Sequence, residues 1–233
     1  MQTLNNVVAV DWRSGADRCY FFFKDTNTYS RFNLADNEAP EGYPTAIRSS
    51  NWNTIHSKLK DLRFGFTTTG INPAHPLDFD SDILWLFYYD GGIPMVCRYD
   101  QDDDVATNSY PVSQSIWHTL LPYFDRIVAG TWWEKSPNPR LFRFLMNDGH
   151  SLSLNLVTDK LTHEPINDST WPGLAPYKDR IMTAVQNDRT FAYSHYYIFL
   201  TNNEYLRYNI PTNRLLAGPI IVDEVSWPGL LRN

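Results

Sequence analysis

Residues 169–185 read STWPGLAPYKDRIMTAV, and residues 225–233 read VSWPGLLRN. The phrase Trp-Pro-Gly-Leu therefore occurs twice, and the second time no hydrophobic segment follows it. A tryptophan opens a comparable segment four times, at intervals of 65, 54 and 56 residues: Trp52, Trp117, Trp171 and Trp227. Self-similarity at a nearly constant interval indicates an internal repeat.

A second motif keeps the same interval. Four short hydrophobic segments precede the tryptophans: Tyr20–Phe23, Leu84–Phe87, Leu141–Phe144 and Tyr196–Phe199. Each is followed by turn residues (KDTNT, YDGG, MNDGH, TNNE) and then by a third motif (YSRFN, VCRYD, LSLN, YLRYN). Asp-Gly and Asn-Asn pairs suit hairpin turns, so each copy is expected to be a small antiparallel sheet. A short helical segment should follow, beginning near Pro172 and kept short by Gly173.

A single sheet of this kind cannot bury both of its faces, but four of them can do so when they stack around an axis. The repeat therefore predicts an all-β, four-bladed β-propeller formed by one domain, residues 1–233. The repeats are placed at approximately 5–60, 61–124, 125–178 and 179–233. After the last Trp-Pro-Gly-Leu a further inner strand is due, and residues 5–11 (NNVVAVD) can supply it. The N-terminal strand and the C-terminal WPGL segment are thus expected to close the ring.

The composition narrows the classes of partner. The 233 residues carry a formal net charge of −6 and no block of Lys or Arg, so no nucleic-acid partner is expected. No apolar run approaches the roughly 20 residues of a spanning helix, so no membrane insertion is expected. The N-terminus shows no signal peptide, which predicts a cytoplasmic or non-classically released protein with Cys19 and Cys97 reduced.

The motifs TYSRFN, VCRYD and EYLRYN and the two WPGL phrases resemble hemopexin-like repeats, a resemblance that covers essentially the whole chain. It implies a four-bladed propeller with a central tunnel, similar to plant albumin-2-type proteins and hemopexin-fold lectins. It also implies that main-chain carbonyls line the tunnel and hold a cation at four positions: Val8, Phe64, Val128 and Met182. No cofactor is required, and a Ca or Na ion in the tunnel is left open. The next column (Ala9, Gly65, Ala129 and Thr183) is small, as the close approach of four strands demands.

Catalytic motifs are missing from the sequence. The six histidines form no His-x-x-x-His motif, and no Gly-x-Ser-x-Gly, phosphate-binding loop or dinucleotide fingerprint occurs. The protein is therefore expected not to be an enzyme. Asp100, Asp102 and Asp104 alternate as at the start of a calcium loop, but Val105 stands where the loop needs glycine, which favours a solvated turn.

Two kinds of large side chain remain to be interpreted. Arg31, Arg98 and Arg207 repeat on one strand and are expected to be blade-to-blade struts over carboxylates. Trp12, Trp132 and Trp133 break the repeat and are the candidate ligand-binding residues, because aromatic rings beside polar side chains stack on sugars. Adjacent strand residues point to opposite faces, so one of the last two should point away from the core or fill a gap between blades.

The function favoured by these features is non-catalytic binding of a glycan or another small polar ligand, that is, a carbohydrate-binding protein of lectin, defence or storage type. The alternatives left open are binding of a polyamine, another cation or heme at the central tunnel, and a protein-interaction platform. A lectin that cross-links cells needs more than one site, which a homodimer would supply.

Overall fold

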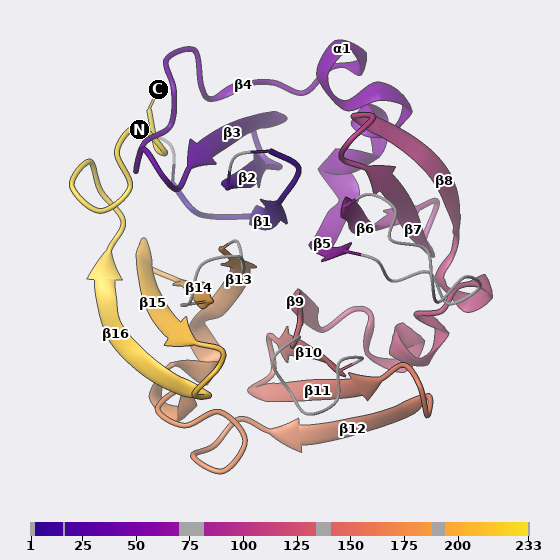
Figure 1. The fold of residues 1–233 in the computed structure, drawn as a ribbon, viewed down its shortest axis with the longest axis vertical. Helices are drawn as coiled ribbons and strands as arrows, with labels where there is room; N and C mark the ends of the chain where they lie inside the picture. Colours follow the sequence, from indigo (N-terminus) through magenta and orange to yellow (C-terminus); the bar gives the residue numbers. More distant parts are fainter. Residues whose placement is uncertain (1–2, 16, 70–81, 134–140, 188–193, 233) are drawn as a thin grey trace.

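Four antiparallel sheets of four strands each form the protein, as the computed structural model shows (Figure 1). The structure describes residues 3–15, 17–69, 82–133, 141–187 and 194–232. Blades 1 and 2 contain β1 (Val7–Trp12), β2 (Arg18–Phe23), β3 (Thr28–Asn33), β4 (Thr45–Ala46), β5 (Leu62–Thr69), β6 (Asp82–Asp90), β7 (Ile93–Asp100) and β8 (Val105–Pro111). Blades 3 and 4 contain β9 (Ile127–Trp132), β10 (Leu141–Met146), β11 (His150–Asn155), β12 (Lys160–Pro165), β13 (Ile181–Gln186), β14 (His195–Leu200), β15 (Glu204–Asn209) and β16 (Arg214–Ile221).

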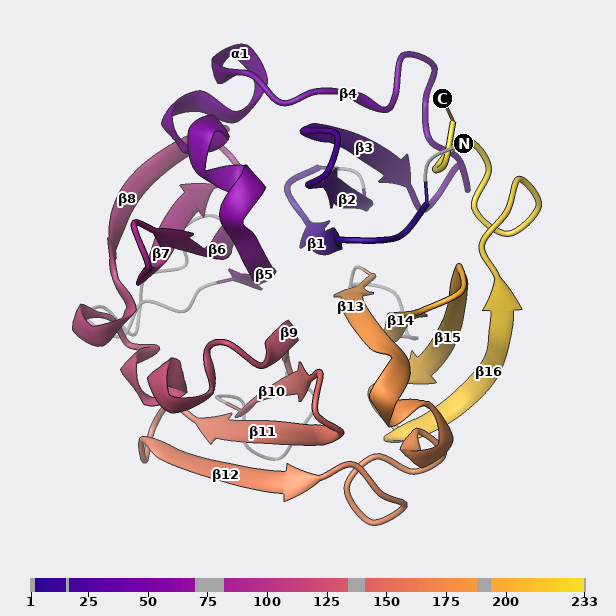
Figure 2. The same ribbon diagram turned by 180° about the vertical axis from the view of Figure 1, so that it is seen from behind.

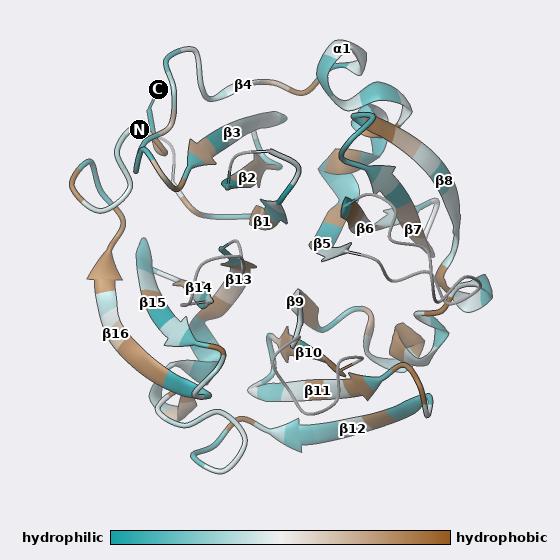
Figure 3. Ribbon diagram, in the orientation of Figure 1, coloured by the Kyte–Doolittle hydropathy of each residue, from teal (hydrophilic) through white to brown (hydrophobic). Residues whose placement is uncertain are grey.

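The blades surround one axis, and β1, β5, β9 and β13 are the innermost strands (Figure 1). The outermost strand β16 has exposed and half-buried residues in turn, and its hydropathy changes along its length (Figure 3). The protein is thus an all-β, four-bladed propeller, as the repeat predicts.

The core consists of four hydrophobic layers, one between each pair of neighbouring blades. Each layer contains one of the four repeated tryptophans, all at most 3% exposed: Trp52, Trp117, Trp171 and Trp227. Side chains of an inner strand alternate between the two layers beside it, because strand residues have a period of two. On β1, for example, Val7 lies in the layer shared with blade 4, and Val8 in the layer shared with blade 2.

Close packing of the inner strands explains why residue 65, one of the small residues near the axis, is a glycine. A Cβ atom on Gly65 would lie 2.8 Å from the carbonyl oxygen of Trp85 and 2.8 Å from Val10 Cγ1. Backbone atoms of the same sheet cannot move aside, so any larger residue there would displace β5 from β6. Thr183 of the same column is polar but satisfied, since its Oγ1 accepts a hydrogen bond from the amide of Ala9 at 3.0 Å.

The helical segments connect blades on one face of the ring (Figure 2). They are the helix α1 (Ser49–Trp52) and the 3₁₀ helices Asn53–Asp61, Val112–Gln114, His118–Tyr123 and Ala175–Arg180. The prediction that a helix begins near Pro172 is wrong, because Gly173 has a φ of +83° and the segment there is a turn. The helix begins at Ala175 instead.

The C-terminal segment closes the ring by packing on blade 1. Trp227 contacts Phe21 and Phe32 of blade 1 and Phe199 of blade 4, with ring centroids 5.6, 4.5 and 5.2 Å away. The Ala39 amide donates a hydrogen bond to the Pro228 carbonyl at 2.9 Å. Residues from both ends of the chain therefore share one hydrophobic layer.

Candidate functional site

A cleft of about 450 Å³ opens between blades 1 and 2, here called the 1/2 cleft. Its lining is aromatic and polar: Trp12, Ser14, Arg18, Tyr20, Tyr29, Arg31, Tyr43, Ser50, Asn51, Trp52, Gln101 and Asp104. Volumes of this order hold small organic ligands, and a few polar groups on an aromatic wall orient them.

The strand pattern of blade 1 explains why these side chains share one wall. Residues two apart on a strand point to the same face, so Arg18 and Tyr20 of β2 lie together, as do Tyr29 and Arg31 of β3. The register pairs Tyr20 with Arg31, which places the two strands' contributions side by side.

Aromatic rings pack tightly at the base of the 1/2 cleft. Trp12 lies 5.2 Å from Tyr20 and 6.4 Å from Trp52, measured between ring centroids, and its indole Nε1 donates to the carbonyl of Ser14 at 3.1 Å. Tyr43 covers Tyr29 edge-on at 5.5 Å. Burial raises the pKa of Tyr20 and of Tyr29, so both hydroxyls stay neutral at physiological pH.

The cleft holds two guanidinium groups and one carboxylate. The Nε atoms of Arg18 and Arg31 are buried and have no hydrogen-bond partner within the described part of the chain. Arg31 lies over the ring of Tyr43, 5.4 Å from its centroid, and takes part in none of the ion pairs found among the described residues. The interpretation of Arg31 as a strut over a carboxylate thus finds no carboxylate partner among the described residues and stays a prediction. Asp104 Oδ1 accepts the Tyr99 hydroxyl at 2.7 Å.

A second cleft of about 450 Å³ lies between blades 3 and 4, here called the 3/4 cleft. It is lined by Trp133, Leu141, Arg143, Ser153, Glu164, Ser169, Thr170, Ile210, Pro211 and Asn213. One hydrogen bond recurs at equivalent positions of the two clefts. The Tyr208 hydroxyl donates to Asn213 Oδ1 at 3.0 Å beside the 3/4 cleft, and the Tyr99 hydroxyl donates to Asp104 Oδ1 beside the 1/2 cleft.

Arg143 distinguishes the two clefts. Its guanidinium lies 3.7 Å from the ring centroid of Trp171 and 4.5 Å from that of Trp133, so two indoles hold it by cation–π contact. It also donates to Asn213 Oδ1 (2.8 Å) and to the carbonyl of Thr170 (2.5 Å). Burial lowers the pKa of Arg143 to about 10, which still leaves it charged at pH 7. The cation of the 3/4 cleft is thus bound by the protein itself.

The structure separates the three predicted ligand-binding tryptophans. Trp12 lines the 1/2 cleft and Trp133 lines the 3/4 cleft, whereas Trp132 stacks on Phe142 (6.3 Å, 15°) in the layer between blades 2 and 3. Trp132 and Trp133 point into opposite layers, yet each is only 7% exposed. Sequence reasoning missed Arg18 and did not connect Arg31 with Trp12, because the cleft joins residues that the repeat motifs do not relate.

The predicted tunnel positions lie on the four inner strands: Val8 on β1, Phe64 on β5, Val128 on β9 and Met182 on β13. The side chains of Val8 and Phe64 are buried in the layers between blades, so the axis can only be reached there by the backbone. The axial ion stays a prediction.

The acidic segment after β7 forms a turn. Asp100 Oδ1 accepts hydrogen bonds from the amides of Asp102 (3.1 Å) and Asp103 (3.3 Å). The carboxylates of Asp100 and Asp104 thus support the turn and the wall of the 1/2 cleft.

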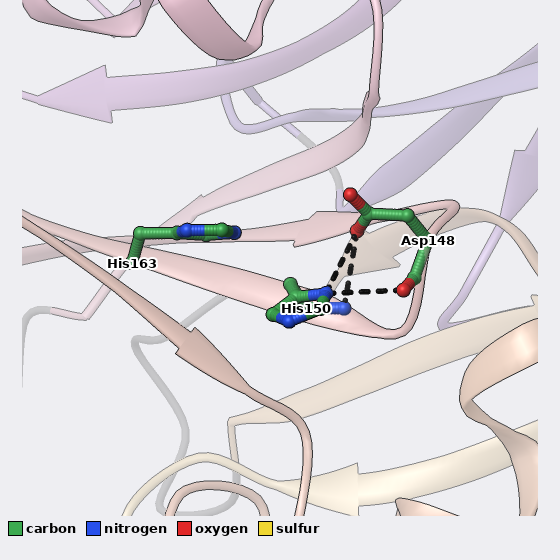
Figure 4. A group of neighbouring side chains, drawn as sticks. All are labelled: Asp148, His150 and His163. Carbon is green, nitrogen blue, oxygen red and sulfur yellow. Dashed lines mark hydrogen bonds and ion pairs between the residues drawn. The ribbon is translucent and has the colours of Figure 1, made fainter.

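A separate cluster on blade 3 offers ligands for a metal ion. Asp148, His150 and His163 each present one ligand atom, and these atoms lie within 4.8 Å of one another (Figure 4). Burial alone would raise the pKa of Asp148, but the hydrogen bond and charge of Arg126 outweigh it and hold that pKa below its usual range. No spacing rule for a single segment finds this group, because its histidines lie on two strands. The feature that brings the group together is the β11–β12 hairpin, whose register places the side chains of His150 and His163 on one face of the sheet.

No family model matches the chain, and no curated protein matches it either. Among solved structures, the crystal structure of BBS1N in complex with ARL6DN, soaked with lead, aligns with 90% of this chain at 8% identity and a TM-score of 0.32. The chain spans about half (54%) of the length of that one. This similarity is too low for an inference about function. No helix in the described ranges is long and apolar enough to cross a membrane.

Proposed function

We propose that this propeller is a non-catalytic carbohydrate-binding protein, and that the 1/2 cleft binds a saccharide carrying an acidic group. The observation that carries the proposal is the pair of arginines, Arg18 and Arg31, in an aromatic cleft with buried Nε donors that no described group accepts.

The aromatic wall supports a sugar as the body of the ligand. Sugar rings present apolar faces that stack on aromatic side chains, while hydroxyl groups exchange hydrogen bonds with polar side chains at the rim. Tyr43, which is half-buried, supplies ring surface above the buried Trp12, and Tyr20 and Ser50 contribute hydroxyl groups to the same lining.

The charges support an acidic group on that sugar. Two guanidinium groups and one carboxylate give the lining a formal charge of +1 on a protein whose net charge is −6. Guanidinium binds carboxylate and phosphate through paired hydrogen bonds, and it does so best where water is partly excluded. A cationic ligand such as a polyamine would be repelled by the same two groups.

The resemblance to hemopexin-like repeats is consistent with a binding role. The motifs TYSRFN, VCRYD, EYLRYN and WPGL support placing the chain with that group, whose members form four-bladed propellers. Because the proposed saccharide site is a single cleft, we infer that cross-linking of cells requires a homodimer.

The test is a glycan array followed by calorimetry with a uronate-containing and a neutral oligosaccharide of equal length, each with and without chelator. Arg31→Ala should weaken binding of the acidic sugar at least tenfold, because it removes a charge-assisted hydrogen-bond donor. Arg207→Ala is the matched control, since Arg207 holds the same place on β15, is exposed and lines neither cleft. Equal losses in the two variants, or tighter binding of the neutral sugar, would contradict the proposal.

A further inference from the structure

The Asp148–His150–His163 cluster belongs to blade 3 and shares no residue with the lining of either cleft. Asp148 sits in the turn between β10 and β11, His150 begins β11, and His163 is on β12. The ladder pairs His150 with Pro165 and Leu152 with His163, so the two histidines are diagonal neighbours on one face of the sheet. Figure 4 shows the His163 ring pointing toward His150, with Asp148 on the other side of His150.

The distances are close to those of a metal site. Tetrahedral zinc with ligands at about 2.0–2.2 Å has its ligand atoms roughly 3.3–3.6 Å apart. Asp148 Oδ1 and His150 Nδ1 are already 3.4 Å apart, and no ligand atom of the group is more than 4.8 Å from another. His163 is exposed, so its ring can rotate to close the remaining gap without disturbing the core.

The neighbours of the cluster orient two of its ligands. Arg126 Nη1 donates to Asp148 Oδ2 at 2.8 Å, and the His150 amide donates to Oδ1 at 3.2 Å. His163 packs between His150 and Tyr123, with ring centroids 4.8 and 4.9 Å away. Hydrogen bonds and packing of this kind around the ligands fix their orientation in metal sites.

The ligand types select the class of ion. Two imidazoles and one carboxylate suit Zn²⁺, Cu²⁺ or Ni²⁺, whereas Ca²⁺ requires six or more oxygen ligands. We propose that Asp148, His150 and His163 bind one divalent transition-metal ion of the zinc class, with water or an external ligand completing its coordination. This site is independent of the saccharide cleft and of the tunnel positions predicted by resemblance.

The experiment is calorimetric titration of the chelator-treated, tag-free protein with ZnCl₂, together with Co²⁺ absorption to report coordination geometry. We expect one Zn²⁺ per chain and binding at least about tenfold weaker in His150→Ala, His163→Ala and Asp148→Asn. Thermal unfolding without metal shows whether each variant is folded. His163→Gln is the second variant, because it keeps most of the ring's volume on an exposed position.

His118→Ala is the control. The His118 Nε2 and Asp159 Oδ2 atoms lie 3.2 Å apart on the surface, so this pair resembles two of the three proposed ligands, and no third ligand joins it among the described residues. The proposal requires its removal to leave zinc affinity unchanged. No binding by the folded wild-type protein, binding that survives loss of both cluster histidines, or equal weakening by His118→Ala would overturn the proposal.

Discussion

The closing contact between the last and first blades can be tested by removing one side chain, Trp227→Ala. Trp227 is 3% exposed, and aromatic rings of both blades surround it. Phe32 lies nearest at 4.5 Å between centroids, with Phe199 at 5.2 Å and Tyr197 at 5.3 Å. Alanine would leave a cavity shared by blades 1 and 4, because these rings are anchored on different strands and can fill the space only in part.

The expected loss follows from the buried area. A tryptophan buries about 150–250 Å², which at about 25 cal/mol per Å² gives roughly 4–6 kcal/mol as an upper bound. Measured substitutions of buried Phe or Trp by Ala cost about 3–5 kcal/mol. We therefore expect the free energy of unfolding to fall by about 4 kcal/mol. For a domain of this size that lowers Tm by about 8–16 °C.

The assay is urea unfolding followed by far-UV circular dichroism, with thiol labelling of Cys19 as a second probe. Cys19 is fully buried in the same layer as Trp227, so it should become reactive in the same transition. Val225→Ala is the control, because Val225 is 85% exposed two residues away and should change stability by less than about 0.5 kcal/mol. An unchanged midpoint, or early labelling of Cys19 while the main transition stays in place, would refute the view that this contact closes the ring.

Three further outcomes are expected. Trp132→Ala should cost about 3–5 kcal/mol of stability in urea melts, since Trp132 is buried against Phe142, while calorimetry shows saccharide binding unchanged. Burial raises the pKa of Cys97 to about 11, so iodoacetamide at pH 8 should leave it unmodified until the protein unfolds; labelling at the rate of a free thiol would show that the core is open there. Burial and the charge of Arg207 lower the pKa of His195, so protonation opposes folding and stability should fall as pH drops from 7 toward 5; urea melts of His195→Asn should show a weaker decline.

The propeller could be predicted from the sequence because its evidence is local and repeated. Each blade carries the same strand, turn and tryptophan motifs, and alternation along a strand decides which side chains enter which layer. The small column around the axis was predictable for the same reason, as the contacts of Gly65 show. The helix start near Pro172 was predicted wrongly, because Gly173 adopts a positive φ and keeps that segment a turn.

The sites could not be predicted in the same way, because neighbouring blades or strands assemble them. Arg31 and Asp104 both line the 1/2 cleft because the turn after β7 lies against blade 1. His150 and His163 share a face only because β11 and β12 pair in one register. A motif search that treats each segment alone detects neither arrangement. The repeat alone does not define the role of Arg31, since its place on the strand recurs but its surroundings do not.

The two clefts show how equivalent positions of a repeated fold acquire different surroundings. Tyr20 and Arg143 are each the third residue of the second strand of their blades, and each faces its blade's cleft. In the 3/4 cleft the arginine at this place is held by two indoles and by Asn213, so its positive charge is stabilised by contacts within the protein. In the 1/2 cleft a tyrosine, Tyr20, holds the equivalent position. The arginine of this cleft is Arg31, which pairs with Tyr20 on the neighbouring strand and whose Nε has no hydrogen-bond partner among the described residues. Equivalent backbone positions therefore carry different side chains: an arginine held by two indoles in the 3/4 cleft, and a tyrosine opposite Arg31 in the 1/2 cleft, where the proposed saccharide site lies.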